Sequence, residues 1–195
     1  KEFITPAFSL SDDKELIVHD MNGDKMAIYA IGNAQEGQEP AGSFFDKKTQ
    51  GLTRLIKIGN NDFISFDPNS TFPFQTANGH NFGKYPFGNE IDNNYNVSQG
   101  NIAYNPDKKI FVYSTISFPY MAAYKKEKDK FELLWEQKGD LDYSISENKI
   151  VLDKKKKGSM ELALTKDYIV TLQRDYQSDP TNEAKVGRDF TKLPQ

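Results

Sequence analysis

Residues 102–137 read IAYNPDKKIFVYSTISFPYMAAYKKEKDKFELLWEQ, and this stretch decides the fold that the sequence predicts. Four short apolar segments, separated by polar or proline-containing turns, lie at 102–104, 110–115, 120–124 and 131–137. Short apolar runs bounded by turn residues are typical of strands. Four antiparallel strands within about 40–50 residues make up one blade of a β-propeller, so the stretch predicts a complete blade.

The last two segments also allow a helix, because aromatic residues at 120, 124, 131 and 135 fall near helical spacing. We prefer strands because the rest of the chain repeats the same layout. In this interpretation Phe131, Leu133 and Trp135 share one face of the last strand, and the two glutamates at 132 and 136 lie on the other. Residues 125–130 then form a charged turn.

The layout recurs four times along the chain. Each unit has one apolar residue that opens a first strand and another, eight positions later, that opens the second strand. These pairs are Phe8/Leu16, Leu55/Phe63, Ile102/Ile110 and Met160/Tyr168, at spacings of 47, 47 and 58 residues. We therefore expect repeat units at approximately 8–50, 55–98, 102–150 and 160–195, with the polar run Asp153–Ser159 inserted before the last.

The repeat predicts an all-β fold, a β-propeller of four-stranded antiparallel blades, with about three to four blades visible of an expected six. Residues 1–195 then form a single, partial propeller domain. Six such blades need roughly 280 residues, and 177–195 offers the last unit no third or fourth strand. A closed four-bladed ring is the alternative.

Two turns support the strand pattern. An Asn-Gly pair separates Leu16–Asp20 from Lys25–Ile31, and this dipeptide favours the two-residue turn of a hairpin. The run Asp67–Ser70 predicts a turn between strands at Phe63–Phe66 and Phe72–Phe74.

The composition narrows the functional classes. Lys plus Arg is 25 and Asp plus Glu is 28, and a net charge of −3 argues against a nucleic-acid partner, which usually meets a basic surface. The absence of Cys excludes disulfides and thiolate chemistry, and no apolar run of about 18 residues predicts a transmembrane helix. No nucleotide, zinc-protease or serine-hydrolase motif occurs, so we expect no cofactor and assign no catalytic residue.

Several runs carry a family resemblance. Gln99–Lys109, Ser117–Tyr120 and Leu162–Tyr176 resemble the TolB-like six-bladed β-propeller family of Bacteroidetes, and Val186–Gln195 resembles a stretch after which that family continues into another strand. The resemblance implies an envelope lipoprotein of unknown function, periplasmic or associated with the outer membrane. Because the chain has no Cys, we expect any lipid anchor to lie outside this segment.

The two histidines are weak candidates for chemistry. His19 lies beside Asp20 at the end of a strand, where adjacent side chains point to opposite faces, so we expect a histidine on the strand surface. His80 lies in the turn-like run Asn78–Asn81 and is a candidate ligand-binding residue, with a solvated turn as the alternative.

Other candidate ligand-binding residues lie next to apolar strands. Arg174, Asp175 and Tyr176 close the last predicted strand, and Arg174 offers a fork of donors to a carboxylate. Tyr85 and Tyr120 belong to two aromatic–Pro runs that suit a sugar or peptide groove. An ion pair within the chain and packing between blades are the respective alternatives.

Three acidic or amide-rich runs offer the oxygen ligands that calcium prefers. They are Asp20–Asp24, Asn60–Asp62 and Asn89–Asn94. None has the spacing of an EF-hand loop, so we predict no metal ligand.

Two functions remain open at this point. The first is a non-enzymatic module that binds a protein, peptide or glycan in the bacterial cell envelope. The second is a propeller hydrolase or sugar-processing enzyme that uses carboxylates, with or without a metal ion. Propellers host both roles, so the fold does not decide between them.

Overall fold

The structure, a computed structural model, describes residues 6–11, 15–20, 26–31, 54–59, 62–67, 70–152 and 158–173. These residues are all-β apart from the single turn of helix α1 (Asn94–Val97). Every strand pairing among them is antiparallel. The all-β prediction is therefore confirmed.

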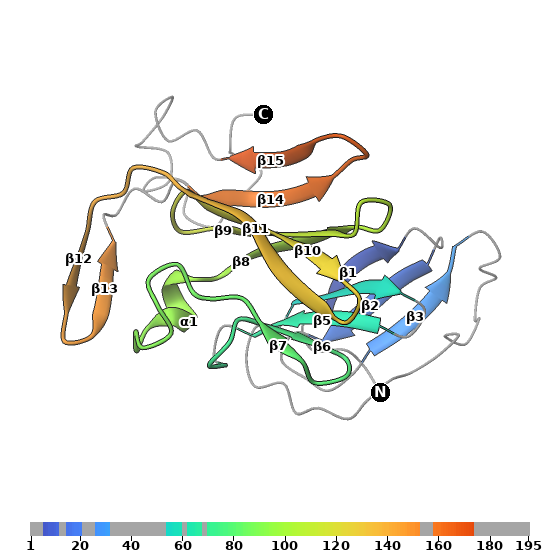
Figure 1. Ribbon diagram of the computed structural model, residues 1–195, viewed down its shortest axis with the longest axis horizontal. Helices are drawn as coiled ribbons and strands as arrows, with labels where there is room; N and C mark the ends of the chain where they lie inside the picture. The colour runs from blue at the N-terminus through green and yellow to red at the C-terminus, as the bar shows by residue number, and fades with distance from the viewer. Residues whose placement is uncertain are drawn as a thin grey trace.

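The strands form four packed sheets and one separate hairpin (Figure 1). The first sheet joins β1 (Pro6–Ser11), β2 (Glu15–Asp20) and β3 (Met26–Ala30). The second joins β4 (Arg54–Gly59), β5 (Asp62–Phe66), β6 (Phe74–Thr76) and β7 (Asn81–Phe82). The third joins β8 (Gly100–Asn105), β9 (Ile110–Thr115), β10 (Tyr120–Glu127) and β11 (Lys130–Lys138). The fourth joins β14 (Ser159–Leu164) and β15 (Ile169–Gln173), and the hairpin joins β12 (Tyr143–Ser146) and β13 (Lys149–Leu152).

The first strands of the four sheets lie next to one another in chain order. β1 contacts β4, β4 contacts β8, and β8 contacts β14. The later strands of the second and third sheets follow outward from these first strands. The sheets thus form a series in which each one packs against the next.

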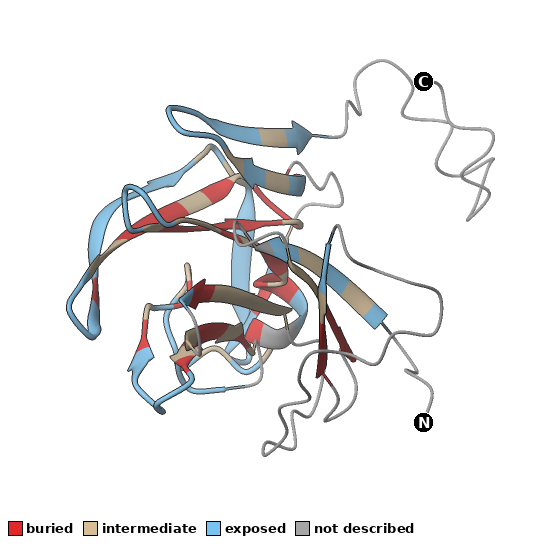
Figure 2. Cartoon of the chain, turned by 90° about the vertical axis from the view of Figure 1, so that its right-hand side faces the viewer, coloured by how far each residue is buried: buried red, intermediate tan, exposed pale blue. Residues whose placement is uncertain are grey.

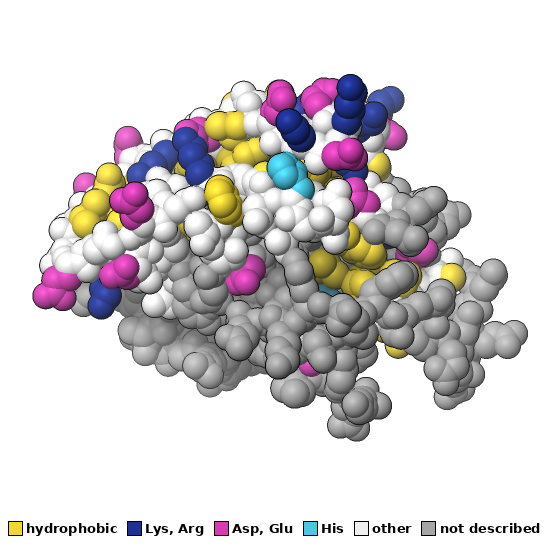
Figure 3. Space-filling view, turned by 60° about the horizontal axis from the view of Figure 1, so that its bottom comes forward, with side chains coloured by type: hydrophobic (Ala, Val, Ile, Leu, Met, Phe, Trp, Pro, Cys, Tyr) yellow, Lys and Arg dark blue, Asp and Glu magenta, His cyan; other side chains and the backbone are white. Residues whose placement is uncertain are grey.

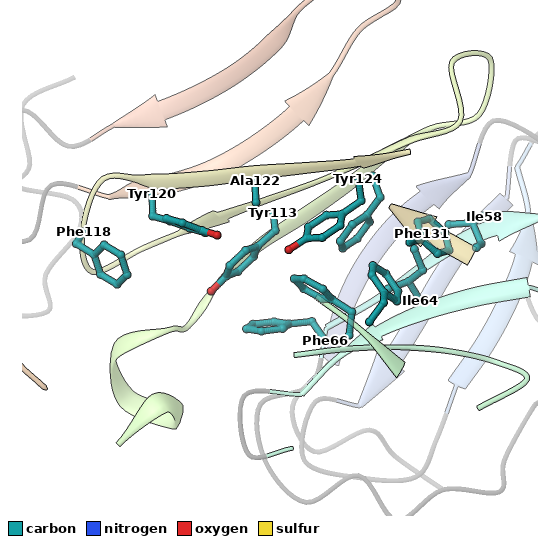
Figure 4. Packing of buried hydrophobic residues seen from close by; sticks show 12 residues of the cluster. Ile58, Ile64, Phe66, Tyr113, Phe118, Tyr120, Ala122, Tyr124 and Phe131 are labelled. Atoms are coloured by element: carbon teal, nitrogen blue, oxygen red, sulfur yellow. The ribbon is translucent and has the colours of Figure 1, made fainter. Parts of the chain in front are cut away.

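Apolar side chains fill the first two interfaces of this series. Ile17, Met26 and Ile28 of the first sheet pack on Phe63 of the second. The larger cluster lies between the second and third sheets, and Figure 4 shows aromatic rings from the two sheets facing each other across it. Phe74 lies at its centre, with ring centroids 4.8 Å from Phe111 and 5.2 Å from Tyr113.

The third sheet is covered on both faces. In its register Ile102 pairs with Tyr113, on the face toward the second sheet, and Ala103 pairs with Val112, on the opposite face. Val112 is 0% exposed because β14 lies across β8 and β9 on that side. The amide nitrogen of Asn101 also donates 3.0 Å hydrogen bonds to the carbonyls of Ser159 and Met160 there.

Within the part of the chain that the structure describes, the fourth sheet is covered on one face only. Leu162 pairs with Thr171, and both are half-buried on the side toward the third sheet. Ala163 pairs with Val170 on the other side, where Val170 is 51% exposed and Leu172 is 62% exposed. Figure 2 shows this contrast, with buried residues inside the third sheet and exposed ones along the fourth.

The β12–β13 hairpin is held by the loop that contains α1. Asn93 uses both atoms of its side-chain amide, which donates to the carbonyl of Ile150 at 2.8 Å and accepts from the amide of Ile150 at 2.9 Å. The turn residues Glu147 and Asn148 have φ values of 49° and 59°, as a two-residue hairpin turn requires. The carbonyl of Asn148 accepts from the amide of Asp92 at 3.0 Å.

The strands predicted for residues 102–137 are confirmed, because β8 to β11 cover all four segments. The helical alternative is wrong. β10 continues to Glu127, so the charged turn predicted at 125–130 is too long at its start. The strand predicted at Phe72–Phe74 is also displaced: β6 begins at Phe74, since Pro73 has no N–H to donate to the ladder.

The faces predicted for β11 are confirmed from Phe131 to Leu133 and wrong beyond Leu133. A β-bulge lies where Tyr124 pairs with Leu133 but the preceding residue, Ala123, pairs with Trp135. Leu134 is the extra residue, and it reverses the alternation of every side chain after it. Glu136, which pairs with Ala122, therefore shares the face of Phe131, while Trp135 lies on the opposite face.

Two smaller expectations also change. His19 is 6% exposed and Asp20 is 3% exposed, so His19 is not a surface residue, although the register does place the two on opposite faces. Phe63 and Phe111 each face the preceding sheet and are 48 positions apart, one more than the predicted repeat spacing. The Asn-Gly turn lies outside the described residues, but its flanking strands pair as predicted.

Candidate functional site

The candidate site lies at the end of β11, where the bulge reorients the strand. Figure 3 shows acidic and basic side chains interspersed on one face of the molecule, so charge alone does not mark a site there. We define the β11 cluster as Lys84, Phe87, Tyr120, Glu136, Lys138 and Tyr143. These residues combine charged groups, a hydroxyl and aromatic rings in mutual contact.

Glu136 is the polar centre of the β11 cluster. Its Oε1 accepts from the Lys84 ammonium at 2.8 Å, and its Oε2 accepts from the Tyr120 hydroxyl at 2.9 Å. The hydrogen bond from Lys84 is the main reason that the pKa of Glu136 lies below its ordinary value. The side chain of Glu136 is still 37% exposed and that of Lys84 is 55% exposed, so both can meet a ligand.

Aromatic rings form the other half of the cluster. The Lys138 ammonium lies 3.9 Å from the ring centroid of Phe87 and 4.7 Å from that of Tyr143. The two rings are 5.0 Å apart, and Phe87 also packs 4.9 Å from buried Phe118. Cations at such distances are attracted by the electron-rich ring faces. Tyr143 remains 46% exposed, which makes it the accessible ring of the cluster.

Two tyrosine hydroxyls border the carboxylate of Glu136 from inside the core. Figure 4 shows the hydroxyls of Tyr120 and Tyr124 pointing toward each other from β10. Burial raises the pKa of both phenols, that of Tyr124 to about 12. The Tyr124 hydroxyl is buried near the backbone of Lys84 but has no hydrogen-bond partner of good geometry among the described residues.

These electrostatics suit binding better than proton transfer. Glu136 holds its charge at neutral pH and Tyr120 holds its proton, so neither is poised as a general acid or base. Burial lowers the pKa of Lys138, and the attraction of Glu136 opposes that shift. The cluster offers hydrogen-bond donors, one carboxylate acceptor and an exposed ring.

The structure places the predicted ligand-binding residues in three different settings. Tyr120 belongs to the β11 cluster. Tyr85 is buried, with its hydroxyl within hydrogen-bond distance of the Asp67 and Ser70 carbonyls, at 3.0 and 2.7 Å. His80 is exposed in the turn after β6, away from the cluster contacts. The third group, Arg174, Asp175 and Tyr176, lies outside the described residues.

The amide-rich run Asn89–Asn94 uses its side chains to hold its own loop. Asn89 Oδ1 accepts from the amide of Tyr85 at 3.2 Å, and the Asn94 amide donates to the carbonyl of Gly88 at 2.9 Å. Across the described ranges, no group of three or more His, Cys, Asp or Glu side chains is arranged to hold a metal ion.

Sequence reasoning missed Lys84, Glu136, Lys138 and Tyr143. Three of them are charged residues of ordinary surface type, and nothing local marks them. A signal did exist for the rings: the two aromatic–Pro runs, 85–87 and 118–120, meet through Phe87 and Phe118. The bulge that brings Glu136 to this face has no signature in the sequence.

No family model matches the chain, and no curated protein matches it. No helix among the described residues is long and apolar enough to cross a membrane.

Proposed function

We propose that this chain is part of a six-bladed β-propeller that acts as a non-enzymatic binding module of the bacterial cell envelope, for a protein, peptide or glycan ligand. The contacts of β1 with β4, of β4 with β8 and of β8 with β14 support the propeller, because first strands of successive blades line a common axis. The sequence resemblance supports the envelope location.

The observation that carries the binding function is the β11 cluster itself. Its charged groups and rings come from β10, β11, β12 and the loop after β7, so a rigid scaffold presents them at the surface. Loops and strand ends on rigid scaffolds are where ligand contacts concentrate. The low pKa of Glu136 favours a fixed charge for recognition over acid–base chemistry.

The test is a binding screen on defined ligands. The immobilised protein is exposed to arrays of glycans and of peptides, and the hits are measured by titration calorimetry. We expect the double variant Tyr143→Ser/Lys138→Gln to weaken binding of the hits at least about tenfold. The matched control Tyr168→Ser/Lys149→Gln alters an exposed tyrosine and an exposed lysine outside the cluster, and should bind normally.

Two outcomes would contradict the proposal. A hit recovered in cleaved form after incubation with the protein would show an enzyme. Equal loss of binding in the control variant would place recognition elsewhere. The envelope location is tested separately, by immunodetection of the natural protein in periplasmic and outer-membrane fractions, and a purely cytoplasmic signal would refute it.

A further inference from the structure

We infer that the ligand of the β11 cluster is an acidic saccharide, a chain of sugar rings that carry carboxylates. This inference rests on the proposed binding function and adds a ligand class to it. It follows from three properties of the cluster: the exposed ring, the excess of one positive charge, and the accessible pair of Glu136 carboxylate and Lys84 ammonium.

The exposed ring provides a platform for a sugar face. Tyr143 is 46% exposed, and its ring is fixed by Phe87 at 5.0 Å. Phe87 is in turn fixed by Phe118, which is 0% exposed. The faces of aromatic rings carry a negative quadrupole and attract polarised C–H groups, such as those on one side of a pyranose. A platform held in this way loses little conformational entropy on binding.

The three charged groups of the cluster, Lys84, Lys138 and Glu136, sum to one positive charge. Glu136 is already neutralised by the Lys84 ammonium at 2.8 Å. Among the described residues, the close contacts of the Lys138 ammonium are with ring faces, 3.9 Å from Phe87 and 4.7 Å from Tyr143, and Glu136 attracts it without forming an ion pair. A carboxylate on the ligand would give Lys138 the partner that its ring contacts do not supply, and such charge-assisted hydrogen bonds are the stronger ones.

Sugar hydroxyls match the remaining polar groups. A hydroxyl both donates and accepts, so one hydroxyl can bridge the Glu136 carboxylate and the Lys84 ammonium, which are each more than a third exposed. A ligand that carries only charge would leave these groups unused.

The experiment is calorimetric titration with four probes. Oligogalacturonate and oligomannuronate hexamers carry sugar rings and carboxylates, maltohexaose carries sugar rings without carboxylates, and hexaglutamate carries carboxylates on a peptide chain without sugar rings. We expect at least one acidic hexamer to bind about tenfold or more tightly than both maltohexaose and hexaglutamate. Tyr143→Ser and Lys138→Gln should each reduce that affinity about tenfold, while Tyr168→Ser and Lys149→Gln should not.

Thermal melting of each variant separates lost binding from lost folding. Tyr143→Phe gives a second readout, because it keeps the aromatic ring and should retain most of the affinity. If hexaglutamate binds as tightly as the acidic hexamers, the inference that the ligand is a saccharide is wrong. If maltohexaose binds as tightly, the inference that the ligand must carry carboxylates is wrong. Absence of binding by both acidic hexamers would overturn the inference as a whole. If the array screen then yields a peptide whose binding is lost in the β11 cluster variants, the proposed binding function holds even though the inference of an acidic saccharide fails.

Discussion

Gly83 is constrained both by its backbone conformation and by the side chain packed against it, whereas Gly79 is constrained by its backbone conformation alone. Both have positive φ angles, 81° and 86°, which side chains with a Cβ rarely adopt. A Cβ on Gly79 would meet nothing within 4 Å, whereas a Cβ on Gly83 would lie 2.5 Å from the ring of Phe74. Phe74 is fully buried at the centre of the largest apolar cluster.

We therefore expect Gly83→Ala to lower the free energy of unfolding by about 2–4 kcal/mol and Gly79→Ala by about 1 kcal/mol. Backbone strain acts in both variants, and overlap with the core acts only in the first. Urea denaturation followed by far-UV circular dichroism measures both. Equal losses would mean that the Phe74 ring moves aside without cost.

Glu136 makes stability depend on pH. Its pKa is lowered in the folded state, first by the hydrogen bond from Lys84, so its ionised form favours folding. That contribution is complete above the ordinary glutamate pKa of about 4.3 and disappears as the pH falls through the lower folded value. Because the side chain is 37% exposed, solvent limits the effect to about 1 kcal/mol or less.

Glu136→Gln should therefore destabilise the protein at pH 7 and match the wild type at pH 2–3, in urea melts recorded across this range. Glu132→Gln is the control, since Glu132 is an exposed glutamate on the other face of the same strand. A constant difference between Glu136→Gln and wild type at every pH would refute the ionic explanation.

At the scale of single elements, alternation and turn residues predicted strands well. The predicted segment 110–115 has the same bounds as β9, because its apolar residues, turn and repeat position all agree. The prediction of which β11 side chains share a face failed after Leu133, because one extra residue, Leu134, reverses the alternation without any change in composition. The charged half of the candidate site depends on that reversal, so it was not predictable from the pattern.

The β12–β13 hairpin depends on a contact distant in sequence. Asn93 reproduces a pair of strand hydrogen bonds with Ile150, and the hairpin is otherwise exposed on most of its residues. Asn93→Ala should leave both backbone groups of Ile150 to water and lower the local opening free energy by about 1–3 kcal/mol.

Hydrogen exchange measures this change directly. The amide of Ile150 should exchange about tenfold or more faster in Asn93→Ala, while amides of β9 stay protected. Asn96→Ala is the control, because the exposed side chain of Asn96 makes no comparable contact with the hairpin. Unchanged protection at Ile150 would show that another contact holds the strand.

At the scale of the whole molecule, the order of the sheets decides which positions are buried. Val112 and Val170 occupy corresponding faces of the third and fourth sheets, the faces directed away from the preceding sheet. Val112 is 0% exposed because the fourth sheet covers it, and Val170 is 51% exposed. Identical substitutions at these positions therefore compare a sheet that is covered on both faces with one that the described residues cover on one face.

Val112→Ala should cost about 2 kcal/mol, from two buried methyl groups and the space they leave. Val170→Ala should cost less than about 0.5 kcal/mol. Thermal or urea melts of the two variants give the comparison. A loss at Val170 as large as that at Val112 would mean that another sheet covers this face in solution.

The repeat in the sequence predicted this succession of sheets better than it predicted their internal register. Aromatic and aliphatic residues that recur at a regular spacing identify strands whose apolar faces must be covered by neighbouring sheets. Phe63 and Phe111 are nonetheless 48 positions apart, because turn lengths differ from unit to unit. Short-range patterns contain no information on such single-residue shifts, and they contain none on contacts like that of Asn93 with Ile150.

The one-sided cover of the fourth sheet has a consequence for how the molecule melts. A sheet with a neighbour on both faces is stabilised by two interfaces, whereas a sheet with a neighbour on one face is stabilised by one. On gentle heating the β14–β15 hairpin should therefore fray first, while the aromatic layer between the second and third sheets persists. The only tryptophan of the sequence, Trp135, is 39% exposed on β11, at the opposite edge of the third sheet from β8, so its fluorescence should stay unchanged through that early step and change when the third sheet unfolds.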